Sequence, residues 1–170
     1  MSGEEPTLPS SLPPLFAVIL AAGLLGAELL HVEQPVGGLE CTSCAQSADK
    51  TLKKIKGVET ASFRTADGVA VVELKPGNTV PLEEIRDAVK RIGYTPKEAR
   101  VTVRGQASLE GGKWLFRVAG GAIEYALDVS AGQEIADQVR QCAGGMAIVD
   151  GSIGAERGAP LKVSSARRGE

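Results

Sequence analysis

Apolar residues in the middle of the chain recur at three- and four-residue steps in two places, which predicts two amphipathic helices. The first stripe follows Ser43 and consists of Ala45, Ala48, Leu52 and Ile55. The second follows Pro81, a residue that the first turn of a helix tolerates, and consists of Leu82, Ile85, Val89 and Ile92. Gly57 and Gly93 stand where a glycine commonly ends a helix, so each helix is expected to stop there.

Strand patterns surround these two helices. Two strand-like runs, residues 58–64 and the β-branched-rich residues 69–74, flank a turn between the helices. A short strand at residues 36–39 is expected before the first helix, and residues 94–103 are expected to be extended after the second. The resulting order over residues 36–100 predicts a ferredoxin-like βαββαβ domain of the α+β class, with both helices on one face of a four-stranded antiparallel sheet.

The last third of the chain is mainly strand-like. Its five predicted strands are residues 101–109, 114–118, 122–129, 146–153 and 161–165. A helix at residues 134–141 separates the third strand from the fourth, and this order predicts a small OB-like β-barrel over residues 101–165. The first barrel strand is expected to continue the last strand of the preceding domain. Trp114 and Phe116 share one strand face, and with 4% aromatic residues in the chain they are assigned to the core rather than to base stacking.

The N-terminal segment differs in composition from the rest. Residues 1–14 hold four prolines and are expected to be disordered. Residues 15–30 begin with an apolar run that is typical of a signal peptide or a membrane anchor, although the residues before it are acidic rather than basic. The alternative is a buried helix of a soluble protein. We therefore expect a cell-envelope protein, exported or anchored in the membrane through residues 15–30, on a side of the membrane that the sequence leaves open.

Net charge and cysteine count narrow the function classes. A net charge of −2 gives no reason to expect a polyanionic partner, so we expect no binding of nucleic acid. The three cysteines do not form the even, spread pattern of a disulfide scaffold. Cys142 stands alone and is expected to be a small buried residue, with a third-ligand role as the alternative. The single histidine, His31, is expected to be a solvated linker residue, with an accessory-ligand role as the alternative.

The pair Cys41-Thr42-Ser43-Cys44 stands between the first predicted strand and the first predicted helix. Two thiols at this spacing can face one ion from a single turn, and thiolates favour soft ions such as Cu(I), Zn(II), Cd(II) and Hg(II). Cys44 falls in the first helical turn, where free N–H groups and the helix dipole stabilise a thiolate. Two ligands are too few for a closed structural zinc site, which takes four. The pair therefore indicates an open site from which a metal ion can be passed on.

The stretch Gly38-Leu39-Glu40-Cys41-Thr42-Ser43-Cys44 is similar to the Gly-Met-x-Cys-x-x-Cys motif of heavy-metal-associated domains, with Leu39 in place of the methionine. This module occurs in copper chaperones, in the N-terminal domains of metal pumps and in periplasmic mercury-binding proteins. Lys56-Gly57-Val58 and Ile92-Gly93-Tyr94 match further family positions, so residues 36–103 resemble this family. The resemblance implies metal ligation by Cys41 and Cys44 and a Tyr94 that packs beside the metal loop.

The expected function is therefore binding of a soft metal ion, Cu(I) or Zn(II) first and Hg(II) after them, for scavenging or for transfer to a metal transporter or another metal-binding domain. Glu40 precedes the first cysteine and is a candidate third ligand, which would favour Zn(II) or Cd(II); a solvated carboxylate is the alternative. Two other functions use the same residues. One is a thiol-disulfide oxidoreductase with Cys41 as its nucleophile, and the other is a structural envelope protein with a degenerate site.

Overall fold

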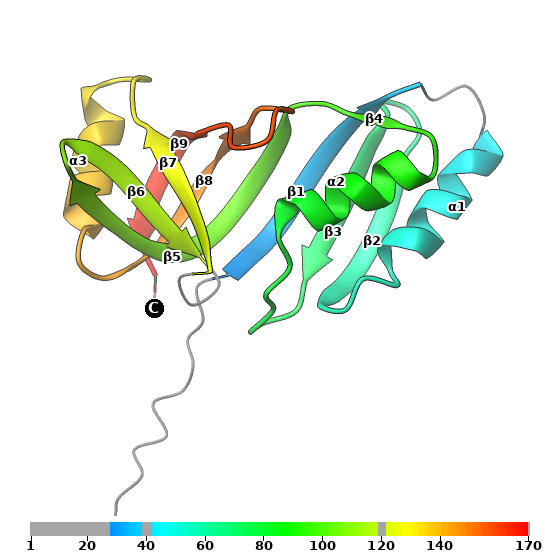
Figure 1. Ribbon diagram of the computed structural model, residues 1–170, viewed down its shortest axis with the longest axis horizontal. Helices are drawn as coiled ribbons and strands as arrows, with labels where there is room; N and C mark the ends of the chain where they lie inside the picture. The colour runs from blue at the N-terminus through cyan, green and yellow to red at the C-terminus, as the bar shows by residue number, and fades with distance from the viewer. Residues whose placement is uncertain (1–27, 39–41, 119–121, 170) are drawn as a thin grey trace, which may run out of the picture.

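The computed structural model describes residues 28–38, 42–118 and 122–169, and only the backbone of residues 42–46 (Figure 1). In chain order, its elements are β1 (Glu28–Gly37), α1 (Thr42–Leu52), β2 (Val58–Arg64), β3 (Val69–Leu74), α2 (Leu82–Arg91), β4 (Thr95–Pro96), β5 (Ala99–Glu110), β6 (Lys113–Val118), β7 (Ile123–Asp128), α3 (Gln133–Cys142), β8 (Met146–Ile153) and β9 (Leu161–Arg168). Among these described residues, no helix is long and apolar enough to cross a membrane.

The first half of the chain folds as the predicted ferredoxin-like unit. Its strands lie in the order β2-β3-β1-β5, and β1 runs antiparallel to both of its neighbours. α1 and α2 lie on one face of this sheet (Figure 1). The helix stripes point into the core, where Leu52, Leu82 and Ile85 are fully buried. Burial of these apolar side chains between helices and sheet is the main force that holds the unit together.

The two helix ends differ from each other. α2 ends at Arg91, and Gly93 follows it with φ +93° while its N–H donates to the carbonyl of Lys90 at 2.9 Å. The glycine stop predicted there is confirmed. α1, in contrast, ends at Leu52, so the predicted continuation to Gly57 is wrong. The chain leaves the helix in a series of turns that still bury Ile55, because an apolar residue can reach the core from a turn as well as from a helix.

The first strand is much longer than the sequence pattern predicted. β1 begins at Glu28 rather than at residue 36, so residues 28–30 belong to the sheet and not to the predicted signal or anchor segment. Residues 15–27 of that segment lie outside the described residues. Buried positions such as Val32 and Val36 alternate with half-buried ones along β1, the two-residue period of a strand. The preceding apolar run hid the start of this alternation.

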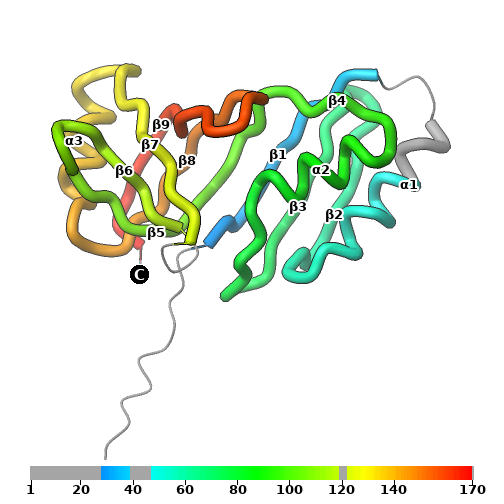
Figure 2. Tube along the Cα trace, in the orientation of Figure 1, coloured from blue at the N-terminus to red at the C-terminus, as the bar shows by residue number. Residues whose placement is uncertain are grey.

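The second half of the chain contains the five strands and the helix that were predicted for it. β5 pairs with β6, β6 with β7, β7 with β9 in parallel, β9 with β8, and β8 with β5. These pairings close into a ring, which we call the barrel, and α3 connects β7 to β8 (Figure 2). Phe116, Val149 and Leu161 are among its fully buried residues, and Phe116 thus takes the core position expected of it. Trp114 is only partly buried against the same core.

β5 belongs to both halves of the molecule. Residues 100–104 of this strand pair with β1 along one edge and with β8 along the other. Residues 106–110 then pair with β6, on the same edge of β5 that pairs with β1 earlier in the strand. The expectation that the first barrel strand continues the preceding strand is confirmed, and the predicted boundary between residues 100 and 101 falls inside β5. Gly105 lies at the change of partner, where a Cβ would collide with the carbonyl of Arg117 on β6.

Candidate metal centre

The Cys-x-x-Cys segment lies in the chain between the end of β1 and the first turn of α1. β1 ends at Gly37, which pairs with Thr95 of β4. α1 begins one residue after Cys41, so Cys44 lies in the first turn of this helix, as the sequence predicts. Glu40 and Cys41 lie outside the described residues, and so does the side chain of Cys44. The predicted ligands are therefore flanked by described backbone on both sides, and their ligation remains a prediction.

The turn after α2 also lies near the Cys-x-x-Cys segment. A Cβ on Gly38 would lie 3.8 Å from the carbonyl oxygen of Gly93, so this turn lies close to the start of the motif. Tyr94 follows and is 5% exposed. Its ring stacks on that of Phe63 in β2, with 5.7 Å between the ring centroids. Tyr94 is thus a core residue directly after the turn that contacts Gly38.

Positive charge near the site lies along α1 and the turns after it, and also at Lys97, whose Nζ would lie 4.0 Å from a Cβ on Gly37. The four lysines Lys50, Lys53, Lys54 and Lys56 are exposed, and none of them forms an ion pair with a described carboxylate. Lys50 lies six positions after Cys44, about 9 Å along a helix axis. The free N–H groups at the start of α1 belong to the same helical turn as Cys44. The helix N-terminus is therefore expected to favour a thiolate at Cys44.

Cys142 does not belong to this site. It is the last residue of α3, is 4% exposed, and burial raises the pKa of its thiol. α3 lies beyond the barrel, at the opposite end of the molecule from α1 (Figure 1). The expectation of a small buried residue is confirmed, and a third-ligand role within one molecule is incompatible with this separation.

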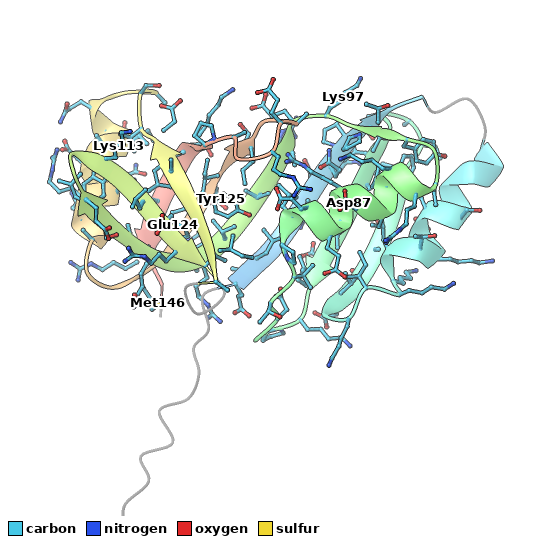
Figure 3. All side chains as sticks on the ribbon, in the orientation of Figure 1. Asp87, Lys97, Lys113, Glu124, Tyr125 and Met146 are labelled. Carbon is cyan, nitrogen blue, oxygen red and sulfur yellow. The ribbon has the colours of Figure 1, made fainter. Side chains whose placement is uncertain are left out.

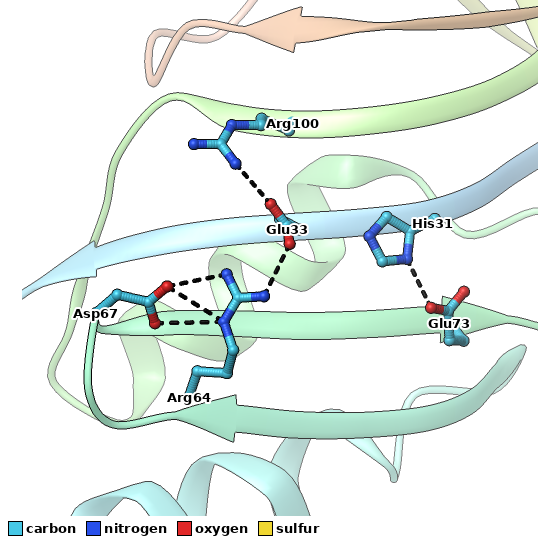
Figure 4. A network of polar contacts seen from close by, with 6 residues as sticks. All are labelled: His31, Glu33, Arg64, Asp67, Glu73 and Arg100. Atoms are coloured by element: carbon cyan, nitrogen blue, oxygen red, sulfur yellow. Dashed lines mark hydrogen bonds and ion pairs between the residues drawn. The ribbon is translucent and has the colours of Figure 1, made fainter.

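His31 lies on a strand and not in a linker, so the linker interpretation is wrong. It occupies the open face of β1, and its Nδ1 is 2.7 Å from a carboxylate oxygen of Glu73 on β3 (Figure 4). Nearby, Glu33 accepts hydrogen bonds from Arg64 and Arg100, each at 2.9 Å. The bond from Arg64 is the main cause that lowers the pKa of Glu33. These contacts pair the charges of the open face with one another, away from the helices.

No cluster of three or more His, Cys, Asp or Glu side chains suited to a metal ion occurs among residues whose side chains the structure describes.

Sequence reasoning missed a buried polar pair, Gln34 and Arg86, which are 0% and 3% exposed. A signal for both was present. Gln34 stands at a buried position of the β1 alternation, and Arg86 stands four residues after Leu82 on the apolar side of α2. A polar residue on an apolar stripe usually has a buried partner.

Comparison with known proteins identifies the unit that carries the motif. Residues 35–95 match the heavy-metal-associated domain family. The chain contains a heavy-metal-associated domain. A zinc-transporting ATPase of Synechocystis sp. is 32% identical over 71 residues, which are 42% of this chain and 10% of the ATPase. The chain thus spans about a tenth of the length of this relative.

Solved structures that match the chain cover the same region. A CopZ metallochaperone is 24% identical, with a TM-score of 0.37, and the match covers 39% of this chain and 97% of the chaperone. The N-terminal domain of PacS from Synechocystis is 31% identical, with a TM-score of 0.34, and the match covers 42% of this chain and 94% of that domain. The family match to residues 35–95, rather than these overall scores, identifies the heavy-metal-associated domain.

Proposed function

We propose that this protein binds one soft heavy-metal ion between the thiolates of Cys41 and Cys44 and either passes it to a second protein or scavenges it. The observation that carries the proposal is a Cys-x-x-Cys pair between the first strand and the first helix of a heavy-metal-associated domain. Domains of this family bind heavy metals, which favours a binding protein over an enzyme. Thiolates are soft anionic ligands that suit such an ion, and the positive end of α1 favours the thiolate form of Cys44.

The open character of the site favours transfer over storage. Two thiolates leave coordination positions free for ligands from another molecule, whereas a structural zinc site is closed by four protein ligands. A metal transporter or another metal-binding domain is therefore the proposed partner. The resemblance of residues 36–103 to metal-pump domains and the match to a zinc-transporting ATPase both support it. We also propose that the protein works in the cell envelope, exported or anchored through the apolar residues that precede β1.

The proposed metals are Cu(I) and Zn(II), with Cd(II) and Hg(II) as further soft ions of the same class. Glu40 decides between them in this proposal. A carboxylate oxygen is a hard ligand, so a contribution from Glu40 would strengthen Zn(II) binding much more than Cu(I) binding. The zinc specificity in the name of the related ATPase is in keeping with Zn(II).

The barrel is proposed to be a scaffold or docking surface with an OB-like architecture. Its closed ring of β5, β6, β7, β9 and β8, with α3 after the third strand, is the support for this proposal. Because β5 is also a strand of the metal-binding sheet, the barrel sits in a fixed position relative to that sheet.

Anaerobic titration of the reduced protein tests the function. Cu(I) and Zn(II) are added against a chromophoric chelator of known affinity, and one ion is expected to bind tightly per chain. Cys41→Ser and Cys44→Ser should each abolish tight binding, while Cys142→Ser is the matched control and should leave the stoichiometry unchanged. Glu40→Gln should weaken Zn(II) and spare Cu(I) if Glu40 is a ligand. Reduction of insulin disulfides without tight metal binding would instead establish the thiol-disulfide oxidoreductase.

A further inference from the structure

A guanidinium group is buried where the metal-binding unit meets the barrel. Arg86 lies on α2 between the apolar residues Ile85 and Val89 and is 3% exposed. Tyr125 of β7 faces this side of α2 (Figure 3), and burial raises the pKa of its hydroxyl to about 12, with the carboxylate of Glu83 adding to the shift. Burial of a charged group is costly unless hydrogen bonds compensate for the lost water. The buried guanidinium of Arg86 therefore needs hydrogen-bond acceptors within the protein.

The acceptors of Arg86 come from two distant parts of the chain. One terminal nitrogen donates to the carbonyl oxygens of Ile153 and Gly154, at 2.9 and 2.7 Å, where β8 ends in the barrel. Nε donates to the side-chain oxygen of Gln34 on β1 at 3.3 Å. The carboxylate of Glu83, at 3.8 Å, is a more distant partner. One side chain of the metal-binding unit thus connects the barrel to β1.

Gln34 extends this connection to the end of β1. Its side chain is fully buried, and its amide nitrogen donates to the carbonyl oxygens of Pro35 and Lys97, at 2.8 and 2.9 Å. The N–H of Lys97 in turn donates to the carbonyl of Pro35 at 2.9 Å. These bonds join β1 to the segment between β4 and β5. They start from Gln34, which lies only three residues before the end of β1 at Gly37.

We propose that Arg86 is a positioning residue of the metal centre, which holds the end of β1 in place through Gln34 and uses the carbonyl groups of the barrel as its anchor. The inference rests on the proposed function, because it assigns Arg86 a role in metal affinity. It also gives the barrel a role, since the barrel supplies two of the acceptors that orient the guanidinium. An apolar residue at position 86 would leave these carbonyls and the Gln34 amide without their donor.

The test compares metal affinity in Arg86→Met, in Gln34→Leu and in the double variant. Each single change should weaken Cu(I) or Zn(II) binding by about tenfold, the lower end of the range for residues that support metal ligands. The double variant should lose no more affinity than the single variants, because both residues act through one connection. Arg64→Met is the control, because it removes an arginine that contacts β1 from the exposed face of the same sheet. It should leave the affinity unchanged.

Arg86→Lys separates the two contacts of Arg86 and serves if Arg86→Met does not fold. The lysine ammonium keeps a donor for Ile153 and Gly154 but has no second nitrogen for Gln34. The metal affinity of Arg86→Lys should therefore fall to the metal affinity of Gln34→Leu. Binding that is equal to wild type in Arg86→Met or Arg86→Lys, or additive losses in the double variant, would overturn the inference.

A readout without metal separates this inference from the proposed function. In the metal-free protein, the amides of Gly37 and Lys97 should exchange their hydrogens faster in Arg86→Met than in wild type and in Arg64→Met. Unchanged exchange contradicts the positioning role even if affinity falls. A wild-type protein that binds no metal refutes the proposed function, whereas a wild type that binds and an Arg86→Met that binds equally well refutes only the role of Arg86.

Discussion

β5 is a strand of both the barrel and the sheet of the ferredoxin-like unit, which is the metal-binding unit. A cavity in the barrel core should therefore destabilise the metal-binding unit as well. Phe116 is the largest fully buried side chain among the residues that the structure describes, and it lies on β6 next to β5. Its replacement by alanine removes most of that side chain, which costs about 3–5 kcal/mol in a well-packed core. For a chain of this size, such a loss lowers the midpoint of thermal unfolding by about 6–20 °C.

Two probes report on the two units in the same sample. Fluorescence of Trp114, the single tryptophan, follows the barrel, and amide resonances of β2 and β3 follow the metal-binding sheet. Both transitions should move together in Phe116→Ala. Leu109→Ala is the matched control, since Leu109 is a large apolar residue of β5 that is 58% exposed. This control should change stability by less than about 0.5 kcal/mol.

The reciprocal change completes the test. Leu82→Ala empties a fully buried position on α2, at a cost of about 2–5 kcal/mol. It should lower the unfolding midpoint reported by Trp114 fluorescence, although Leu82 does not belong to the barrel. A barrel transition that moves in Phe116→Ala while the resonances of β2 and β3 keep their wild-type midpoint would refute the reasoning. The two units would then unfold independently, in spite of the strand that they share.

Three further predictions concern charge and backbone contacts. Arg104 pairs with Glu28, whose side chain is fully buried, so Arg104→Met should cost about 3–5 kcal/mol in chemical denaturation, and Glu28→Gln in that background should recover part of the loss. The pKa of Glu33 lies below its ordinary value of 4.5 in the folded state, mainly because Arg64 donates a hydrogen bond to it. The stability from this carboxylate is present above the unfolded pKa and is lost as the pH falls through the folded pKa, so Glu33→Gln should make the unfolding free energy fall less steeply on acidification below the ordinary value. Gly151→Val should lower the unfolding midpoint sharply, because a Cβ there would collide with a carbonyl of β9.

Much of the fold could be predicted because its elements are regular over short distances. The stripe from Leu82 to Val89 has helical period and is buried as expected, and Gly93 ends α2 as predicted. The strands of the barrel and α3 also appear close to their predicted places. In each case, the burial pattern of one element is written in consecutive residues, so no knowledge of its neighbours is needed.

The candidate site was only partly predictable for the same reason. Cys44 lies in the first turn of α1, which local pattern could predict, and Cys41 precedes that helix. The pattern places Arg86 and Gln34 on buried faces, but it does not reveal their partners, which are distant in the chain. Arg86 donates to carbonyl groups that lie 67 and 68 residues further along the chain.

The sequence by itself determined the order of helices and strands, the Cys-x-x-Cys pair before α1 and the resemblance to a heavy-metal-associated domain. The tertiary structure alone decided that β1 starts at Glu28, that β5 pairs with β1 along one edge and with β8 along the other, and that Cys142 lies far from α1. The physical reason lies in the range of the interactions. Hydrophobic periodicity records which side of an element is buried, whereas strand pairing and the burial of a polar side chain depend on groups that are distant in the chain.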